Sequence, residues 1–282
     1  MMPPPPAVLK DREFKRFSGL IYDQAGIKLP PAKKTMLEGR LQKRLKHLGL
    51  SNFESYADYV FSPEGQENEL VHLIDVVTTN KTDFFREPDH YEHLTRTILP
   101  AIIDSRADCR KEPIRIWSAG CSSGEEPYTL AMVLADNAQD RCDFRFTITA
   151  SDISTHVLEQ AITAIYPEER IEPLPERYKR KYLLRSKDRT NSLVRICPEI
   201  RSLVTFKQIN FMADDFGMRQ KMDIIFCRNV VIYFNKDTQQ TLMSKFHQQL
   251  HEGGFLFLGH SESLNGLDVD FKSVASTIYR KT

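Results

Sequence analysis

The chain has 282 residues, of which 41% are hydrophobic and 27% are charged, with a formal net charge of +1. This length allows a full hydrophobic core and exceeds the usual single domain, so we expect one large domain and a smaller one. No apolar run approaches the roughly 20 residues of a membrane span, which excludes membrane insertion. The first residues lack the basic flank and apolar stretch of a signal peptide, so we expect a cytoplasmic protein.

Five cysteines are scattered along the chain without C-x-x-C pairing: Cys109, Cys121, Cys142, Cys197 and Cys227. An odd number with this spacing is typical of reduced thiols, and it favours neither a disulfide framework nor a zinc site. We therefore expect no bound metal.

Charge is unevenly distributed in the first hundred residues. Residues 1–50 carry eleven Lys or Arg against four Asp or Glu, whereas residues 51–100 carry three against ten. Apolar residues between 36 and 48 recur at helical spacing and predict a helix, with Arg40, Lys43, Arg44 and Lys46 on its basic side. A solvated helix face explains such a run most simply, and a docking surface for an acidic partner is the alternative. Residues 51–77 also read as helical, with a break at Pro63 and Gly65, and complete a small helical domain.

The stretch from Ile114 to Tyr128 organises the rest of the chain. Residues 114–117 predict a buried strand, and the small residues from Ser118 to Gly124 predict a tight loop. Glu125 and Glu126 suit the positive end of a helix dipole, so a helix is expected next. A strand, a glycine-bearing turn and a helix form a ligand cradle at the carboxyl end of a parallel sheet.

Two features of this cradle indicate its ligand. The spacing Gly120-x-x-x-Gly124 differs from the dinucleotide motif G-x-G-x-x-G, and two carboxylates stand where a pyrophosphate needs free helix N–H groups. Residues 144–149 predict the next strand, and Asp152 after it suits a ribose diol. S-adenosylmethionine has both a positive group and a ribose, so this pattern predicts it as the cofactor.

The remaining chain predicts an α/β fold with one interruption. Residues 78–88 form a polar connection, in which Phe84 and Phe85 are expected to anchor the core. A helix is expected at 153–165, and an inserted antiparallel sheet at about 167–204. The α/β pattern then resumes with strands at 204–209, 223–227 and 255–259, a helix at 238–251 that Gly253 and Gly254 end, and a terminal hairpin at 271–280.

Several long motifs in one order resemble the chemotaxis receptor methyltransferases of the CheR family. They are residues 79–87, TNKTDFFRE; 117–128, WSAGCSSGEEPY; 150–153, ASDI; 226–234, FCRNVVIYF; and 259–262, GHSE. The resemblance covers about residues 10–280. It implies a helical receptor-docking domain at 1–89 and a Rossmann-like class I methyltransferase domain at 90–282, with the small antiparallel β-subdomain inserted. It also implies esterification of glutamate side chains on the cytoplasmic helices of bacterial chemoreceptors, with S-adenosyl-L-homocysteine as the cofactor product.

The resemblance also implies the site residues. The cofactor-binding set is Asn80, Thr82, Arg86, Glu125, Glu126, Asp152, Asn210, Phe211, Cys227 and Arg228. Which of Glu125 and Glu126 faces the methionyl amino group stays open, and Asn210, Phe211 and Cys227 also suit a turn cap or core packing. Arg86 and Tyr233 are the residues expected to hold and orient the substrate carboxylate.

Rival functions lack their motifs. A nicotinamide oxidoreductase would need G-x-G-x-x-G, and a nucleic-acid methyltransferase typically has Asn/Asp-Pro-Pro-aromatic where this chain has Cys227-Arg228-Asn229-Val230, so we expect no nucleic-acid partner. A scaffold without turnover would be expected to lose Gly120, Gly124, Asp152 or Arg86, and all are present. A receptor methyltransferase of a related surface-sensing pathway stays an alternative.

The insertion raises the question of a second receptor contact. In some family members this β-subdomain adds a C-terminal receptor pentapeptide as an extra strand, and the loop between its strands carries glycines. Here residues 186–192 contain no glycine, although Asn191 is present to substitute in part. The sequence therefore favours a peptide-independent enzyme that finds its receptor through the N-terminal helices.

Overall fold

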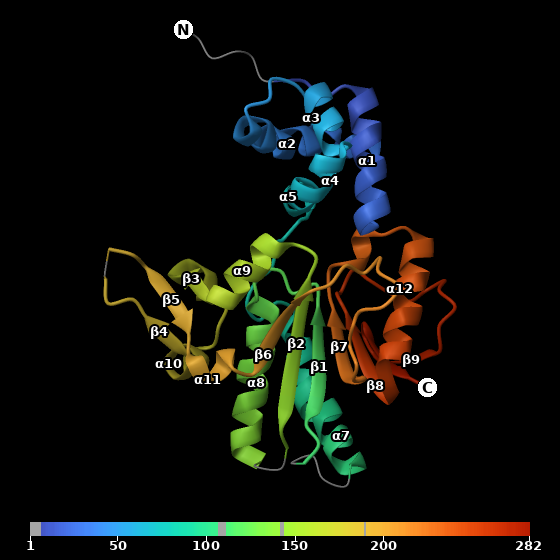
Figure 1. Cartoon of the computed structure of the whole chain (residues 1–282). Coiled ribbons are helices and arrows are strands. Elements are labelled where there is room, and N and C mark those ends of the chain that lie inside the picture. The colour runs from blue at the N-terminus through green and yellow to red at the C-terminus, as the bar shows by residue number, and fades with distance from the viewer. Residues whose placement is uncertain (1–6, 107–110, 142–143, 189) are drawn as a thin grey trace.

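The computed structural model describes residues 7–106, 111–141, 144–188 and 190–282. The N-terminal residues form a helical domain, drawn in blue in Figure 1. It lies above the α/β domain, on the side where helices α9 and α12 begin. The helices of this domain are α1 (Asp11–Ala25), η1 (Pro31–Lys33), α2 (Lys34–Leu48), α3 (Phe53–Val60), α4 (Pro63–Asn68) and α5 (Leu70–Val77). Both predicted helical regions are thus confirmed.

The helical domain has its own hydrophobic core. Fully buried side chains from α1, α2, α3 and α5 meet in it, among them Phe17, Leu41, Tyr56 and Leu73. Pro63, expected only as a break, is the first residue of α4, because its missing N–H has no helical partner there and Ser62 accepts a bond from Gly65 N. This core ends at Val77, whereas Phe84 packs in the core of the α/β domain, as expected of an anchor.

A seven-stranded sheet, in the order β6-β2-β1-β7-β8-β10-β9, forms the centre of the α/β domain. Its strands are β1 (Ile114–Ala119), β2 (Phe146–Asp152), β6 (Val204–Gln208), β7 (Met222–Cys227), β8 (Leu250–Leu258), β9 (Phe271–Ala275) and β10 (Ile278–Lys281). The first five strands of the spatial order are parallel, and the predicted terminal hairpin β9–β10 joins antiparallel to β8. The strand order reverses between β1 and β7, the place where open α/β sheets bind ligands.

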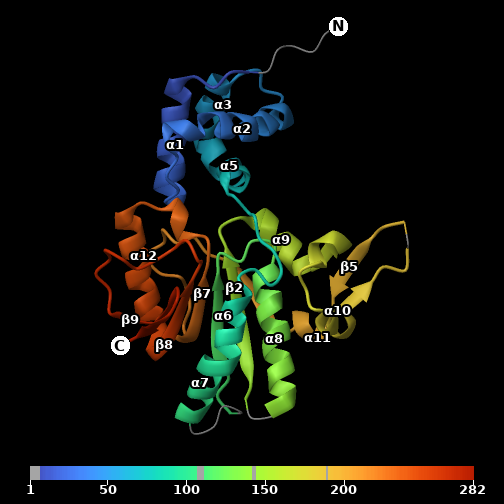
Figure 2. The same ribbon diagram turned by 180° about the vertical axis from the view of Figure 1, so that it is seen from behind.

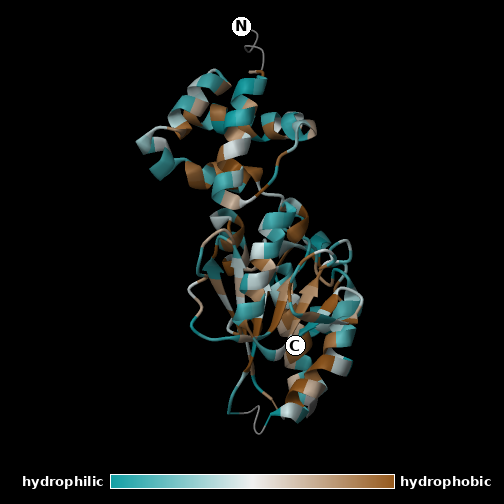
Figure 3. Ribbon diagram, turned by 90° about the vertical axis from the view of Figure 1, so that its right-hand side faces the viewer, coloured by the Kyte–Doolittle hydropathy of each residue, from teal (hydrophilic) through white to brown (hydrophobic). Residues whose placement is uncertain are grey.

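Helices cover both faces of the sheet and enclose two cores. One face packs against α6 (Pro88–His93), η2 (Leu94–Ile98), α7 (Leu99–Ser105) and α8 (Glu125–Arg141), as seen from behind in Figure 2. The other packs against α12 (Lys236–Gln249). Along β1, Ile116 faces the first core and Trp117 the second, as strand alternation requires. Figure 3 shows brown strands in the interior and teal on much of the outer helix surface.

The predicted insertion is a three-stranded antiparallel sheet in the order β3-β5-β4. Its elements are β3 (Ile165–Pro167), η3 (Glu168–Ile171), α10 (Glu176–Tyr182), β4 (Leu183–Arg185), β5 (Leu193–Ile196) and α11 (Pro198–Arg201). It follows α9 (Thr155–Thr163) and begins two residues earlier than expected. Three consecutive basic residues, Lys179, Arg180 and Lys181, lie in the last turn of α10, where cations suit the helix dipole.

Other differences from the expected elements are small. The glycines expected to end the last helix instead lie inside β8, where Gly253 has φ +75° and Cβ atoms at both positions would crowd neighbouring atoms. The helix ends at Gln249, next to the first strand residue. The helices between residues 88 and 105 were not predicted. Among the helices that the structure describes, none is long and apolar enough to cross a membrane.

Three of the five cysteines can be placed. Cys121, Cys197 and Cys227 are buried and free, and Cys109 and Cys142 lie outside the described residues. Burial raises the pKa of the Cys227 thiol, so it behaves as a neutral core group.

Candidate active site

A pocket lies where the helical domain meets the carboxyl ends of the parallel strands. It has an empty volume of about 1200 Å³, part of it open to solvent. Its walls come from the loops after β1, β2, β6 and β7, from the connection at 78–86 and from the start of α2. Nine predicted site residues line it: Asn80, Thr82, Arg86, Glu126, Asp152, Asn210, Phe211, Arg228 and Tyr233.

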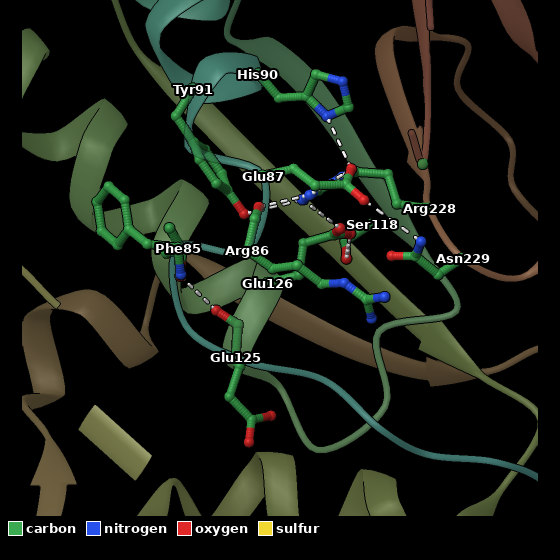
Figure 4. A network of polar contacts seen from close by, with 12 residues as sticks. Phe85, Arg86, Glu87, His90, Tyr91, Ser118, Glu125, Glu126, Arg228 and Asn229 are labelled. Carbon is green, nitrogen blue, oxygen red and sulfur yellow. Dashed lines mark hydrogen bonds and ion pairs between the residues drawn. The ribbon is translucent and has the colours of Figure 1, made fainter. Parts of the chain in front are cut away.

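Two predicted cofactor residues do not line this pocket. Cys227 is the last residue of β7 and is fully buried in the core beside α12. The Glu125 carboxylate points away from the network of Arg228 (Figure 4). It accepts a hydrogen bond from Arg170 of the insertion at 2.5 Å. Of the two glutamates, Glu126 lines the pocket and Glu125 does not, so the geometry favours Glu126 as the partner of a bound cofactor.

A buried ion-pair network forms the inner wall of the pocket (Figure 4). Arg228, with a side chain only 2% exposed, donates to Glu87 Oε2 at 2.9 Å and to Glu126 Oε2 at 3.2 Å. It also donates to the Tyr91 hydroxyl at 3.2 Å and to the backbone carbonyl of Arg86 at 2.5 Å. One guanidinium thus holds the start of α8, the end of β7 and the connection together.

The network has two carboxylates and one guanidinium, so it can accommodate one more positive charge. Burial raises the pKa of Glu126, and the Arg228 guanidinium opposes that rise. Arg228 is shared between Glu126 and Glu87, so two carboxylates face one cation. An ammonium group near Glu126 would complete the balance, which fits the amino group of the predicted S-adenosylmethionine.

Asp152 occupies the position expected for a ribose partner. It ends β2, lines the pocket, and accepts hydrogen bonds from Ser122 N at 2.8 Å and Ser154 N at 3.0 Å. Burial raises the pKa of its carboxyl, while these backbone N–H groups lower it. Each carboxylate oxygen has further lone pairs, so Asp152 can fix the central loop and still accept bonds from a diol. Ile153, Ile209 and Phe211 add apolar wall that suits an adenine ring.

The loop after β7 is held by a residue without an assigned role from sequence. The Glu262 carboxylate, 6% exposed, accepts backbone N–H bonds from Gly259, Asn229 and Val231 at 2.7–2.8 Å, and from Ile232 at 3.3 Å. Asn229, which the site prediction missed, lines the pocket with φ +59°. Asparagine tolerates this left-handed conformation better than most residues, and that property was a usable signal.

The two residues predicted to hold a substrate carboxylate, Arg86 and Tyr233, lie in the same pocket. The Arg86 side chain donates to the Lys81 carbonyl at 3.2 Å, and among the described residues it forms no ion pair with a carboxylate. The backbone carbonyl of Tyr233 accepts from Lys28 N of the helical domain at 3.0 Å. Lys28, Lys33 and Met36 also line the pocket, a contribution that the sequence analysis missed.

The basic residues of α2 divide into two kinds. Arg40 donates to the carbonyls of Val77 and Thr78 and to Thr79 Oγ1, so it caps the end of α5. Arg44 forms a two-bond ion pair with Glu69, at 2.6 and 2.7 Å, in which the Glu69 side chain is 2% exposed. Lys43 and Lys46 are exposed. Arg40 and Arg44, predicted as docking residues, are therefore half-buried and already paired inside the helical domain, which favours a structural role for both.

One group of potential metal ligands lies beside the ion-pair network. Glu87, His90 and His260 each offer an atom within 4.8 Å of the others. The Glu87 oxygen nearest His90 already accepts two bonds from Arg228, whose positive charge disfavours a metal ion there. Burial lowers the pKa of His90 to about 4, so this imidazole is neutral near pH 7.

The sequence matches two family models in tandem. They are the all-alpha domain of the CheR methyltransferases, over residues 12–78, and their SAM binding domain, over residues 80–280. The chain is 40% identical to a chemotaxis protein methyltransferase of Borreliella burgdorferi, over 97% of this chain and 95% of that protein. It is 38% identical to one of Escherichia coli, over 96% and 91%. The chain therefore belongs to the family of CheR methyltransferases.

Proposed function

We propose that this protein transfers the methyl group of S-adenosylmethionine to glutamate side chains on the cytoplasmic domains of chemoreceptors, and so sets adaptation in chemotaxis. One observation carries the proposal. A single pocket brings Glu126 and Asp152, which suit the cofactor, together with Arg86 and Tyr233, which suit a carboxylate. Family membership supports the same reaction, and we place the protein in the cytoplasm with its receptors.

The reaction asks mainly for positioning. S-adenosylmethionine, when bound, supplies a methyl group already activated by its sulfonium. A glutamate carboxylate is ionised at pH 7, so it needs no general base. The residues of the pocket therefore have to hold the carboxylate in line with the methyl group and exclude water, and correct placement removes much of the barrier.

Arg86 and Tyr233 suit this positioning role. The Arg86 charge is not used by a protein carboxylate among the described residues, so it remains available for the substrate. The Tyr233 ring is half-buried at the pocket wall, where its hydroxyl can orient one carboxylate oxygen by a hydrogen bond. Full neutralisation by Arg86 would weaken the nucleophile, so we assign Arg86 to placement and not to tight pairing.

The exposed lysines of α2 remain the proposed docking residues. Lys43 and Lys46 project from the helix whose first turn lines the pocket, and clustered positive charge steers an acidic partner. We propose that they contact the acidic receptor helices, while Arg40 and Arg44 keep the helix in place.

Whether the insertion binds a receptor pentapeptide is a separate question. The turn between β4 and β5 forms without glycine, because Asp188 accepts bonds from Thr190 N at 2.9 Å and Asn191 Nδ2 at 3.0 Å. Residue 189 lies outside the described residues. β4 pairs with β5 along one side and is an edge strand of this sheet. The preference for a peptide-independent enzyme therefore stays a prediction, and titration with receptor pentapeptides decides the matter.

Radiolabelled methyl transfer tests the proposed function. The purified protein is incubated with S-adenosylmethionine and a panel of receptor cytoplasmic domains, including receptors of surface-sensing pathways. We expect base-labile methyl esters on one receptor class, and none when its target glutamates are replaced by alanine. Calorimetry with S-adenosylhomocysteine, NAD and RNA is the companion measurement. Binding of the first alone is expected, and a protein that binds it without methylating any receptor would be a scaffold.

A further inference from the structure

Two residues of the insertion contact the walls of the cofactor pocket. The Tyr166 hydroxyl, in β3, donates to the carbonyl of Ser123 in the central loop at 2.7 Å. Arg170, in η3, donates through Nη2 to Glu125 Oε1 at 2.5 Å and to the Thr82 carbonyl at 2.7 Å. The insertion thus reaches two segments of the pocket that are far apart in the sequence.

These contacts lie directly behind pocket residues. Thr82 lines the pocket from the connection, and Glu125 precedes Glu126 at the first turn of α8. Glu125 Oε2 accepts from Ser123 Oγ at 2.7 Å, so the Arg170 partner also ties down the loop before the helix. A shift of Arg170 would move both the connection and the loop.

The Arg170–Glu125 ion pair has one fully buried member, so water screens it less than it screens a surface pair. The Glu125 side chain is 1% exposed and that of Arg170 is 35% exposed. Removing one member of such a pair leaves an unpaired buried charge, whereas replacing both by neutral groups of similar size is often tolerated. The carboxylate of Asp83 lies 3.7 Å from Arg170 and adds a weaker, more exposed attraction.

We propose that Arg170 is a positioning residue for S-adenosylmethionine, and that the inserted β-subdomain is thereby a structural part of the cofactor pocket. Arg170 acts through Thr82 and Glu125 and does not itself line the pocket. Its loss should weaken cofactor binding and leave the chemical step at saturating cofactor nearly unchanged. The inference rests on the proposed function only for the identity of the ligand.

A double-mutant cycle on the full-length protein tests the inference. Calorimetry with S-adenosylhomocysteine is performed on Arg170→Met, Glu125→Gln and the double variant. We expect at least a tenfold weaker affinity in Arg170→Met and a partial return towards wild type in the double variant, where no charge is left unpaired but the bond to the Thr82 carbonyl is still missing. The Michaelis constant for S-adenosylmethionine should rise in Arg170→Met, with kcat changed less than twofold.

The matched control is Arg185→Met, which removes an exposed insertion arginine paired with Glu168 at 3.2 Å, and it should bind as wild type does. Wild-type affinity in Arg170→Met would overturn the inference, as would an equally weak double variant. If Arg170→Met does not fold, Arg170→Lys replaces it: an ammonium lacks the planar fork, so a threefold or greater loss supports the inference and none overturns it. Failure of the wild-type protein to bind S-adenosylhomocysteine would instead reject the proposed function.

Discussion

The carboxylate of Glu262 accepts a hydrogen bond from the backbone N–H of Asn229 at 2.8 Å, across the gap between the ends of β8 and β7. The same carboxylate accepts three further backbone bonds, from Val231, Ile232 and Gly259. The loop that carries Arg228, Asn229 and Tyr233 into the pocket is therefore folded around one buried anion.

Glu262→Gln should weaken cofactor binding through this loop. An amide offers one acceptor oxygen, so its NH₂ group would face one pair of backbone donors, and each buried donor left unpaired costs about 1–3 kcal/mol. We expect at least a tenfold loss of S-adenosylhomocysteine affinity by calorimetry, and a lower thermal midpoint. Glu92→Gln, at an exposed glutamate paired with Arg96, is the control and should match wild type. Unchanged affinity in Glu262→Gln would show that the loop does not depend on the anion.

Asp152→Ala should lose cofactor affinity while keeping the fold. The substitution removes the proposed ribose acceptor and the acceptor of Ser122 N and Ser154 N. Loss of a charged hydrogen-bond partner costs about 1.5–3 kcal/mol, which corresponds to a roughly 10- to 150-fold weaker affinity. Calorimetry measures the loss and circular dichroism checks the fold. A wild-type dissociation constant would reject the ribose role.

Arg86→Ala and Tyr233→Phe should lower turnover more than cofactor affinity. Both residues are assigned to the substrate carboxylate, so their removal should lower kcat with receptor by a larger factor than it weakens S-adenosylhomocysteine binding. Parallel methylation assays and calorimetry separate these effects. Equal losses in both measurements would make the two residues cofactor ligands.

Replacing Lys43 and Lys46 by glutamate should raise the Michaelis constant for receptor and flatten its salt dependence. Both lysines are exposed, so the double variant should keep wild-type cofactor affinity. Lys272→Glu, at an exposed position of β9, is the charge control. Wild-type kinetics in the double variant would show that Lys43 and Lys46 belong to an ordinary solvated helix face and do not dock the receptor.

Arg44→Glu should behave differently from the lysine variants. It would place a second carboxylate beside buried Glu69 and should destabilise the helical domain, by about 3–5 kcal/mol for a broken buried pair. A lower thermal midpoint, with receptor kinetics affected only through unfolding, is the expected result. A stable variant with a selectively raised Michaelis constant would restore Arg44 to the docking surface.

Cofactor affinity should fall as the pH is lowered from 7 towards the ordinary glutamate value of 4.5. Burial raises the pKa of Glu126, so this carboxyl takes up a proton at a higher pH than an exposed glutamate does. The protonated form cannot pair with the cofactor ammonium, so binding at low pH must release a proton. Calorimetry in buffers of different ionisation enthalpy measures that proton. Glu126→Gln should bind weakly at pH 7 and lose most of this pH dependence, and a wild-type protein without proton release would contradict the role of Glu126.

The sequence predicted the fold where local patterns agree with tertiary packing. The strand before Gly120, the helix from Glu125 and the inserted antiparallel sheet all have periodicity that the structure confirms. The helices between residues 88 and 105 have weaker signals, because Pro88 and Pro100 interrupt the apolar pattern and a π-helical turn lies between them. Gly253 and Gly254 were predicted to end a helix, but they lie inside β8. Glycine is typical of helix ends, and it is equally suited to crowded or positive-φ positions within a strand.

The sequence predicted most residues of the candidate site, but not the direction in which each side chain points or the partner that it binds. Glu125 and Glu126 are neighbours with the same chemistry, and only the positions of Arg170 and Arg228 send one to the insertion and the other to the pocket. Arg40 and Arg44 read as surface charge because their partners, the end of α5 and Glu69, are more than 20 residues away in the sequence. Such long-range pairing has no local signature.

The pocket lies between two independently packed parts of the chain. The helical domain has its own core, and two hydrogen bonds connect it to residues that line the pocket. Lys28 N donates to the Tyr233 carbonyl at 3.0 Å, and Asn210 Nδ2 donates to the Gln24 carbonyl at 2.6 Å. A ligand that needs both parts stabilises both, by about 2.7 kcal/mol when present at 100 times its dissociation constant. Two melting transitions should therefore merge as cofactor is added. On heating, methylation should stop as soon as the first of the two parts unfolds, because the pocket needs residues from both.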